Sequence, residues 1–318
     1  MRLSRTLLAL ALAAGIGLSL ATPASAHSRA GLLERFRPVL VFQDDEAFRP
    51  IRVERFVGDS NLEAATSPTT WVVVDPHPRA NSLPTTSPPV WRLNQRDCFA
   101  GAPLGDLPCY VAAAGEKRRG TIYGRVARDG GAIVLQYWLF YYDDLYSYPF
   151  LPPGTIWQSH EGDWEVVNVV LSRHERPLAV GYSQHCSGEV RSWDDTSRWK
   201  SHPKVFVALG SHANYFEPGV HSFDPTCLPA DVVAFFQQAG LPLPADVVDA
   251  AGTSERARVA RLSRHHPPRW LAFPGFWGEL QYFHAPPPVG TVPFGTSPQG
   301  PAFHAVWSQP LATLATWH

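Results

Sequence analysis

A short segment of this chain carries a histidine and three carboxylates directly ahead of a run of β-forming apolar residues. The segment is SHEGDWEVV, Ser159–Val167, in a sequence of which only 17% is charged. Alternate residues of a strand share a face, so Asp163 and Glu165 are predicted to point the same way, with His160 in the turn before them. Two carboxylates buried this close together without a partner would be strongly unfavourable. The segment therefore needs a cation or contact with water.

A bound divalent cation is one answer to this charge. The strand that follows is apolar on both faces through Leu171, so it is predicted to be an interior strand with little water nearby. Carboxylate and imidazole ligands without a thiolate favour Mg²⁺, Ca²⁺ or Mn²⁺ over Zn²⁺. The alternative is that arginines of the chain pair with the acids in salt bridges. The pattern leaves both open.

Further polar side chains fall at the predicted ends of neighbouring strands. Asp143 and Asp144 end the aromatic run QYWLFYY, and His185 ends the run YSQH. The segment GSHANYF supplies His212 and Asn214. Because the loops of a sandwich gather at strand ends, these residues are candidates to complete a ligand shell. Glu161, inside the first segment, is a further polar neighbour.

None of the common catalytic motifs occurs. The sequence contains no GxSxG, HExxH, P-loop or post-strand GxGxxG pattern. We therefore expect a binding protein rather than an enzyme. Two alternatives remain: a secreted metal-dependent hydrolase of phosphoester or glycolipid substrates, and a structural exported domain without catalysis.

The distribution of apolar residues predicts a mainly β protein. Short runs rich in Val, Ile, Trp, Tyr and Phe recur between Gly and Pro clusters, as in AIVLQYWLFYY and WEVVNVVL. This pattern is typical of a two-sheet antiparallel β-sandwich, here with a few peripheral short helices. The pair Gly130-Gly131 is predicted to form a hairpin turn.

One region has the signals of helices instead. Segments Pro229–Gly240, Pro244–Gly252 and Ser254–Ser263 carry early prolines or a serine, with alanine and arginine inside, and glycine closes the first two. They predict a helical insertion at about 229–263. No linker divides the chain, so residues 27–318 are expected to form a single domain.

The first 26 residues have the pattern of a secretory signal peptide. Arg2 and Arg5 precede the apolar run Leu7–Leu20, and Ala24-Ser25-Ala26 supplies a small-residue cleavage site. The apolar run is shorter than the roughly 20 residues of a spanning helix. The protein is therefore expected to be secreted or otherwise extracytoplasmic.

The four cysteines fit this compartment. Their even number and the absence of a CxxC pair favour two disulfides over a zinc site. We favour Cys98–Cys109 and Cys186–Cys227, although three pairings are possible.

The charge balance argues against a nucleic-acid partner. The chain has 27 basic and 28 acidic side chains, for a formal net charge of −1. Only three of the basic residues are lysines, and no long run of like charge occurs.

Several motifs, taken in order, resemble a known family. HEGDWE (His160–Glu165), GSHANY (Gly210–Tyr215), a late FWGE (Phe276–Glu279) and an early FRPVLVFQDDEAFRPIRVERF (Phe36–Phe56) are similar to proteins related to vacuolar protein sorting-associated protein 62. A more distant resemblance links HEGDWE to the heptad GHRHDWE of the necrosis-inducing (necrosis and ethylene-inducing peptide-like) proteins.

The second resemblance implies a fold, a cofactor and a ligand class. That family has a two-sheet sandwich with a few helices, and it binds a divalent cation used in docking to sphingolipid head groups. The matching metal ligands here are His160, Asp163, Glu165, either Asp143 or its neighbour Asp144, and His185. Gly162 and Glu161 depart from the heptad, which bears on membrane damage more than on the metal. The expected function is secreted, cation-dependent binding of a lipid or glycan head group.

Overall fold

The computed structural model describes residues 28–115, 120–148, 156–228, 230–287 and 290–318. The predicted signal peptide, residues 1–26, lies outside these ranges. Among the described residues, no helix combines the length and apolar character needed to span a membrane.

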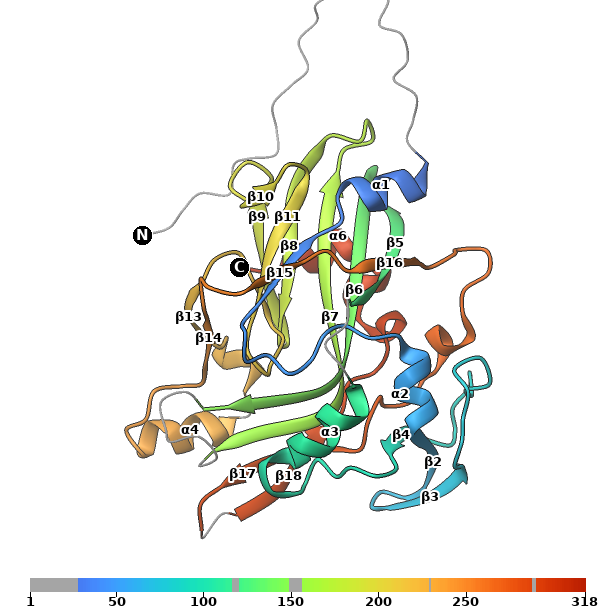
Figure 1. The fold of residues 1–318 in the computed structure, drawn as a ribbon, viewed down its shortest axis with the longest axis vertical. Coiled ribbons are helices and arrows are strands. Elements are labelled where there is room, and N and C mark those ends of the chain that lie inside the picture. The colour runs from blue at the N-terminus through green and yellow to red at the C-terminus, as the bar shows by residue number, and fades with distance from the viewer. Residues whose placement is uncertain (1–27, 116–119, 149–155, 229, 288–289) are drawn as a thin grey trace, which may run out of the picture.

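The largest sheet has eight strands built around one long ribbon (Figure 1). Strands β6 (Ala132–Ser147) and β7 (Trp157–Leu171) pair along nearly their whole length. The aromatic and β-branched side chains of both strands favour this extended pairing. The remaining strands are β5 (Thr121–Asp129), β8 (Pro177–Gln184), β9 (Ser187–Ser192), β16 (Arg258–Arg261), β17 (Leu280–Ala285) and β18 (Gly290–Thr296).

The turn between β5 and β6 confirms the predicted hairpin. β5 ends at Asp129 and β6 begins at Ala132, which leaves Gly130 and Gly131 as a two-residue loop. Both glycines have positive φ, 51° and 83°, as a type I′ turn requires.

A second sheet of five strands packs against this one. It consists of β1 (Val39–Phe42), β10 (Arg198–Trp199), β11 (His202–Val207), β12 (Asn214–Tyr215) and β15 (Thr253–Glu255). Side chains of β1 and β11, such as Leu40 and Val205, share one buried cluster with Tyr137 of β6 and Val167 of β7. The predicted mainly β sandwich is confirmed. It is not wholly antiparallel, because β1 pairs with β11 and β16 pairs with β5 in parallel.

Two small sheets and short helices surround the sandwich (Figure 1). The small sheets are β2 (Ser60–Ser67) with β3 (Thr70–Asp75) and β4 (Trp91–Gln95), and β13 (Gly219–Ser222) with β14 (Ala245–Val248). The helices are α1 (Arg29–Arg35), α2 (Val53–Asp59), η1 (Pro103–Asp106), α3 (Leu107–Ala114), η2 (Pro225–Cys227), α4 (Ala230–Gln238), η3 (Arg269–Ala272), η4 (Pro301–Phe303), α5 (Ala305–Ser308) and α6 (Pro310–Leu314).

The predicted helical insertion at about 229–263 is correct only in its first part. Helix α4 occupies the first segment, but the second and third contain β14, β15 and β16. Each of these strands pairs with a different sheet: β14 with β13, β15 with β1, and β16 with β5. Helix propensity is a weak preference, and in segments this short the pairing with neighbouring strands outweighs it.

Candidate metal centre

The candidate ligands lie inside the β6–β7 ribbon. β6 continues to Ser147 and β7 begins at Trp157, so that Asp144 pairs directly with His160. The expectations that Asp144 ends a strand and that His160 lies in a turn are therefore wrong. The β-formers on both sides of the acids carry the strands through them.

Among the described residues, no strand pairs with one edge of β7 where these residues lie. β17 pairs with β7 only as far as Ser159, and β8 pairs with it only from Val167 onwards. Residues 160–166 fall between the two pairings. Side chains from loops outside the sheet can therefore approach this part of the strand.

The alternation of side chains between the two faces breaks at Gly162. This residue has φ of +56°, and a Cβ atom there would overlap the carbonyl oxygen of Trp277. Two separate effects exclude a side chain at this position: the positive φ of the backbone and the overlap with the Trp277 carbonyl. Glycine therefore permits a local reversal of side-chain direction, so that the residues before and after it no longer alternate regularly between the two faces.

The reversal sends Glu161 and Asp163 to opposite faces. Tyr141 and Tyr142 are adjacent in β6 and so face opposite sides. Tyr141 stacks on His212, with ring centroids 3.8 Å apart, and the same histidine contacts Asp163. Tyr142 instead donates a hydrogen bond to the side chain of Gln95, whose backbone N–H donates to Glu161.

Three buried residues form the centre of the candidate site. Asp144, Asp163 and His212 each offer a ligand atom, and these atoms lie within 4.8 Å of one another. Nδ1 of His212 lies 3.2 Å from Oδ2 of Asp163. Nε2 of His160 lies 3.6 Å from Oδ2 of Asp144. The structure thus brings together Asp144, Asp163, His160 and His212 of the predicted residues.

Several oxygens of these acids lack a partner. Among the described residues, neither carboxylate oxygen of Asp143 and only one of Asp144 takes part in a hydrogen bond or ion pair. Burial raises the pKa of Asp144 to about 6. Burial and the neighbouring Asp144 raise the pKa of Asp143 well above its ordinary value. Ionised, these groups need a counter-charge that the hydrogen bonds do not supply.

Glu165 lies on the same face as Asp163, as the two-residue spacing predicts. Its Oε2 accepts hydrogen bonds from the hydroxyl of Ser183 and from Nδ2 of Asn214, the latter at 3.2 Å. Burial, reinforced by the charge of Asp163, raises the pKa of Glu165 well above its ordinary value. Asn214 is therefore a positioning group for Glu165.

A second carboxylate, that of Glu46, contacts the other ring nitrogen of His212. Nε2 of His212 lies 3.4 Å from Oε1 of Glu46, which also accepts the backbone N–H of Phe48. Although burial works against the charged imidazole, Glu46 and Asp163 raise the pKa of His212 well above its ordinary value. Glu46 is absent from the residues predicted from the sequence. Its one signal there is its place in an acidic run, QDDE, directly after the strand VLVF.

The partner of His185 is likewise absent from the predicted residues. Nε2 of His185 lies 2.8 Å from Oδ2 of Asp246. Ser211 and Tyr215 each donate a hydroxyl hydrogen bond of 2.6 Å to the same carboxylate. His185 is outside the group of Asp144, Asp163 and His212, and one of its ring nitrogens is committed to Asp246. Asp246 lies in the segment that is expected from the sequence to be helical.

Glu161 belongs to a different buried group on the opposite face. It accepts hydrogen bonds from the hydroxyl of Tyr110 at 2.7 Å and from the backbone N–H groups of Gln95 and Glu279. Burial and the nearby Glu279 raise the pKa of Glu161 to about 8. The carboxylate of Glu161 is thus directed away from Asp163, while its partner on the neighbouring strand is Asp143, whose pKa it helps to raise.

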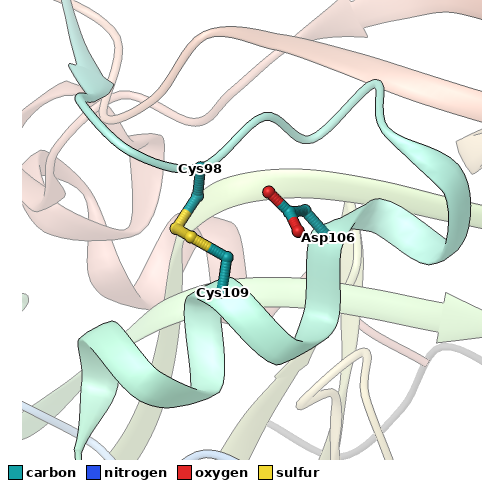
Figure 2. Close-up of side chains that lie close together, drawn as sticks. All are labelled: Cys98, Asp106 and Cys109. Carbon is teal, nitrogen blue, oxygen red and sulfur yellow. A yellow bond between two sulfur atoms is a disulfide. The ribbon is translucent and has the colours of Figure 1, made fainter.

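Both favoured disulfides are present. Cys98 bonds to Cys109, and Cys186 bonds to Cys227. Figure 2 shows the carboxylate of Asp106 beside the first bridge. Both sulfurs there are consumed in the S–S bond, so this group offers no thiolate to a metal. The second bridge anchors the residue that follows His185.

Comparisons with known proteins support the first resemblance. No protein-family profile matches the chain. The chain is 26% identical over 204 residues to TDA6 of Saccharomyces cerevisiae, described as a vacuolar protein sorting-associated protein, covering 56% of this chain and 42% of that protein. It is 24% identical over 235 residues to vacuolar protein sorting-associated protein 62 of the same yeast, covering 67% of this chain and 50% of that protein. The chain thus spans half or less of each relative, and the resemblance to this group is confirmed.

Solved structures of necrosis-inducing proteins are also similar to this chain. One is NLPPya in complex with mannosamine, with a TM-score of 0.38, 13% identity and coverage of 79% of both chains. Another is the necrosis and ethylene inducing protein 2 from the causal agent of witches' broom disease of cocoa, with a TM-score of 0.35, 15% identity and coverage of 76% of both chains.

Proposed function

We propose that this chain is an exported protein that holds a divalent cation and uses it to bind the head group of a glycan or a lipid. The observation that carries the proposal is a buried group of three acids, Asp144, Asp163 and Glu165. Within the described ranges, none of them has an arginine or lysine partner. Three carboxylates in one interior region require compensation by protons or by a cation.

The arginine alternative finds no support in the described part of the chain. The salt bridges that arginines make there involve other acids, such as Arg92 with Glu63 and Arg49 with Glu255. The basic groups beside the three acids are imidazoles, chiefly His160 and His212. Two imidazoles cannot fully neutralise three carboxylates, since each carries at most one charge.

The donor set fits a divalent cation. Oδ1 of Asp144 has no hydrogen-bond partner among the described residues, and carboxylates with one imidazole are common ligands for Mg²⁺, Mn²⁺ and Ca²⁺. Asp144, Asp163 and His160 would hold the ion. His212, with a carboxylate on each ring nitrogen, fixes the orientation of Asp163. Glu165 completes the acidic face from the next position along the strand.

The location of the group favours binding over a purely structural ion. The side chain of His160 is 13% exposed and that of His185 is 21% exposed, whereas His212 is fully buried. His160 is therefore the more accessible of the two imidazoles beside the acids. A bound cation next to it would supply positive charge, which attracts hydroxyl or phosphate oxygens of a head group.

Export is supported by the cysteines. Two disulfides with no free cysteine among the described residues suit an oxidising compartment. The predicted signal peptide agrees with this location.

Elemental analysis with matched variants tests the cation. Purified protein dialysed against a mixture of Mg²⁺, Ca²⁺ and Mn²⁺ should retain about one ion per chain. Asp163→Asn and Asp144→Asn should lose it. Glu161→Gln should keep it, because this buried acid faces the other side. Metal-free native protein, or equal loss in all three variants, contradicts the proposal.

Head-group binding is tested separately. The wild-type protein should bind members of a glycan array, or vesicles containing glycosylated sphingolipid, in the presence of the retained cation and not in EDTA. Binding of equal strength in EDTA, or no binding under either condition, rules out cation-dependent recognition even if the ion itself is found.

A further inference from the structure

A large cavity lies on the part of the sandwich away from the candidate metal centre. Its volume is about 590 Å³. It is bordered by α1, by β5 and the start of β6, by the chain after β16, and by α5 and α6. Figure 1 shows α1 beside β5 and β16. A cavity of this size is typical of sites for small organic molecules.

The rim of this cavity is strongly basic. It carries five arginines, together with His265 and a single carboxylate, Glu175; the arginines are Arg29, Arg125, Arg128, Arg261 and Arg264. Across the described residues, none of the five forms a salt bridge, unlike Arg92 or Arg191 elsewhere. The whole chain has a net charge of −1, so the concentration of arginine here is local.

Arg125 holds fixed positive charge at the inner part of the rim. Its Nη1 donates to Oε1 of Gln136 at 3.0 Å and to the carbonyl oxygen of Trp307 at 2.7 Å. Its guanidinium lies over the Trp307 ring, 3.7 Å from the centroid. Both hydrogen-bond partners are neutral, so they orient the charge without neutralising it. Burial and the nearby Arg264 lower the pKa of Arg125 to about 10, which still leaves it cationic at neutral pH.

The floor of the cavity is apolar. Leu32 and Leu33 of α1, Ile133 of β6 and Leu271 of η3 line it and are buried. A bare inorganic anion would contact the arginines and leave this floor unused. A neutral apolar molecule would fill the floor and leave the arginines unpaired.

We propose that this cavity binds a small amphipathic anion, whose phosphate or sulfate group lies on the guanidinium groups and whose apolar body lies on the leucine floor. Guanidinium groups bind such oxyanions through paired hydrogen bonds. The site is separate from the candidate metal centre. Ile133 and Asp144 lie on the same strand, eleven residues apart, which corresponds to roughly 35 Å at the usual rise. The proposal therefore does not depend on the proposed function.

Calorimetric titration with three matched ligands tests this site. Octyl phosphate, kept below its micelle concentration, should bind saturably with about one molecule per chain. Octyl glucoside has the same tail without the charge, and inorganic phosphate has the charge without the tail. Each should bind at least about tenfold more weakly than octyl phosphate, since each lacks one half of the contacts.

Charge-matched variants identify the cavity. Arg261→Gln with Arg264→Gln should weaken octyl phosphate binding by about tenfold or more, the effect of losing one charge-assisted hydrogen bond. Arg52→Gln with Arg79→Gln removes the same charge from exposed residues outside the cavity and should leave binding unchanged. Circular dichroism melting of both pairs verifies folding. Absence of saturable binding, equal binding of octyl glucoside, or equal weakening in the control pair overturns the proposal.

Vesicle sedimentation distinguishes two sources of the same anion. Vesicles of phosphatidylcholine with added phosphatidic acid should retain the wild-type protein, and not the Arg261→Gln, Arg264→Gln variant, if the natural ligand is a membrane lipid. Binding of free octyl phosphate without vesicle retention supports the site and assigns its ligand to soluble anions.

Discussion

Glu161 and Asp163 stand two residues apart in one strand, yet their carboxyl groups lie on opposite faces of the sheet. Asp163 contacts His212, and Glu161 accepts a hydrogen bond from Tyr110. The ribbon therefore separates two buried acidic groups that the sequence places side by side. Oδ1 of Asp144 in the first group has no hydrogen-bond partner among the described residues, whereas the carboxylate of Glu161 is surrounded by N–H and O–H donors.

The separation depends on Gly162, and its replacement should be costly. We expect Gly162→Ala to lower the free energy of unfolding by about 2–4 kcal/mol, because it adds strain at positive φ to overlap with the Trp277 carbonyl. Gly131→Ala is the control, since Gly131 also has positive φ, but a Cβ atom there would have no other atom within 4 Å. It should cost about 1–2 kcal/mol. Urea unfolding measures both, and equal losses would contradict the close approach of Trp277.

The raised pKa values of the buried acids predict that metal-free protein is less stable at higher pH. The folded-state pKa is about 6 for Asp144 and about 8 for Glu161, against about 4 in the unfolded chain. An acid with a raised folded pKa stabilises the fold fully below its unfolded pKa and loses this contribution as pH rises through the folded value. Stability in EDTA should therefore fall between about pH 4 and pH 8.

A variant on the opposite face checks the assignment. Glu161→Gln cannot ionise, so the difference in free energy of unfolding between about pH 5 and pH 8 should shrink. Asp45→Asn changes an exposed acid and should leave that difference unchanged. A wild-type stability that rises across this range would show that Glu161 is ionised without penalty in the folded protein.

Asp246 is expected to stabilise the end of β8 through His185. Asp246→Asn replaces a buried charge that pairs with His185 and accepts from Ser211 and Tyr215. We expect a loss of about 3 kcal/mol in unfolding free energy and a lower His185 pKa, since the charge of Asp246 raises that pKa against the effect of burial. NMR titration of His185 reports the second effect. Asp249→Asn, on an exposed neighbour, should change neither; an unshifted His185 pKa in the first variant would contradict the pair.

Local pattern predicted the strands well where it was strong. The aromatic and valine runs of β6 and β7 and the turn at Gly130-Gly131 follow from residue type alone. The ends of β6 and β7 do not follow from residue type, because Asp144 and His160 are poor strand formers that are held in the strands by pairing with each other. The segment 244–263 failed for a related reason. Its alanines and arginines fit a helix, but three different partner strands, distant in sequence, make it extended.

The residues of the acidic site likewise include some that the sequence predicts and others that it does not. Asp163 and Glu165 could be assigned to one face because two-residue spacing holds between them. Glu46 and Asp246 come from parts of the chain remote from HEGDWE, so no spacing rule could link them to the site. Sequence periodicity also could not place Glu161, since the reversal at Gly162 depends on how closely the Trp277 carbonyl approaches.

Removal of the cation should weaken the fold without abolishing it. A cation at a hundredfold excess over its dissociation constant should add about 2.7 kcal/mol to the free energy of unfolding. EDTA should remove this increment and leave a cooperative transition, because the two disulfides and the aromatic core remain. Asp163→Asn should show no increment, whereas Glu161→Gln should show the full one. Differential scanning calorimetry measures each, and unfolding of wild-type protein by EDTA alone would indicate that the ion is required for the fold rather than for binding.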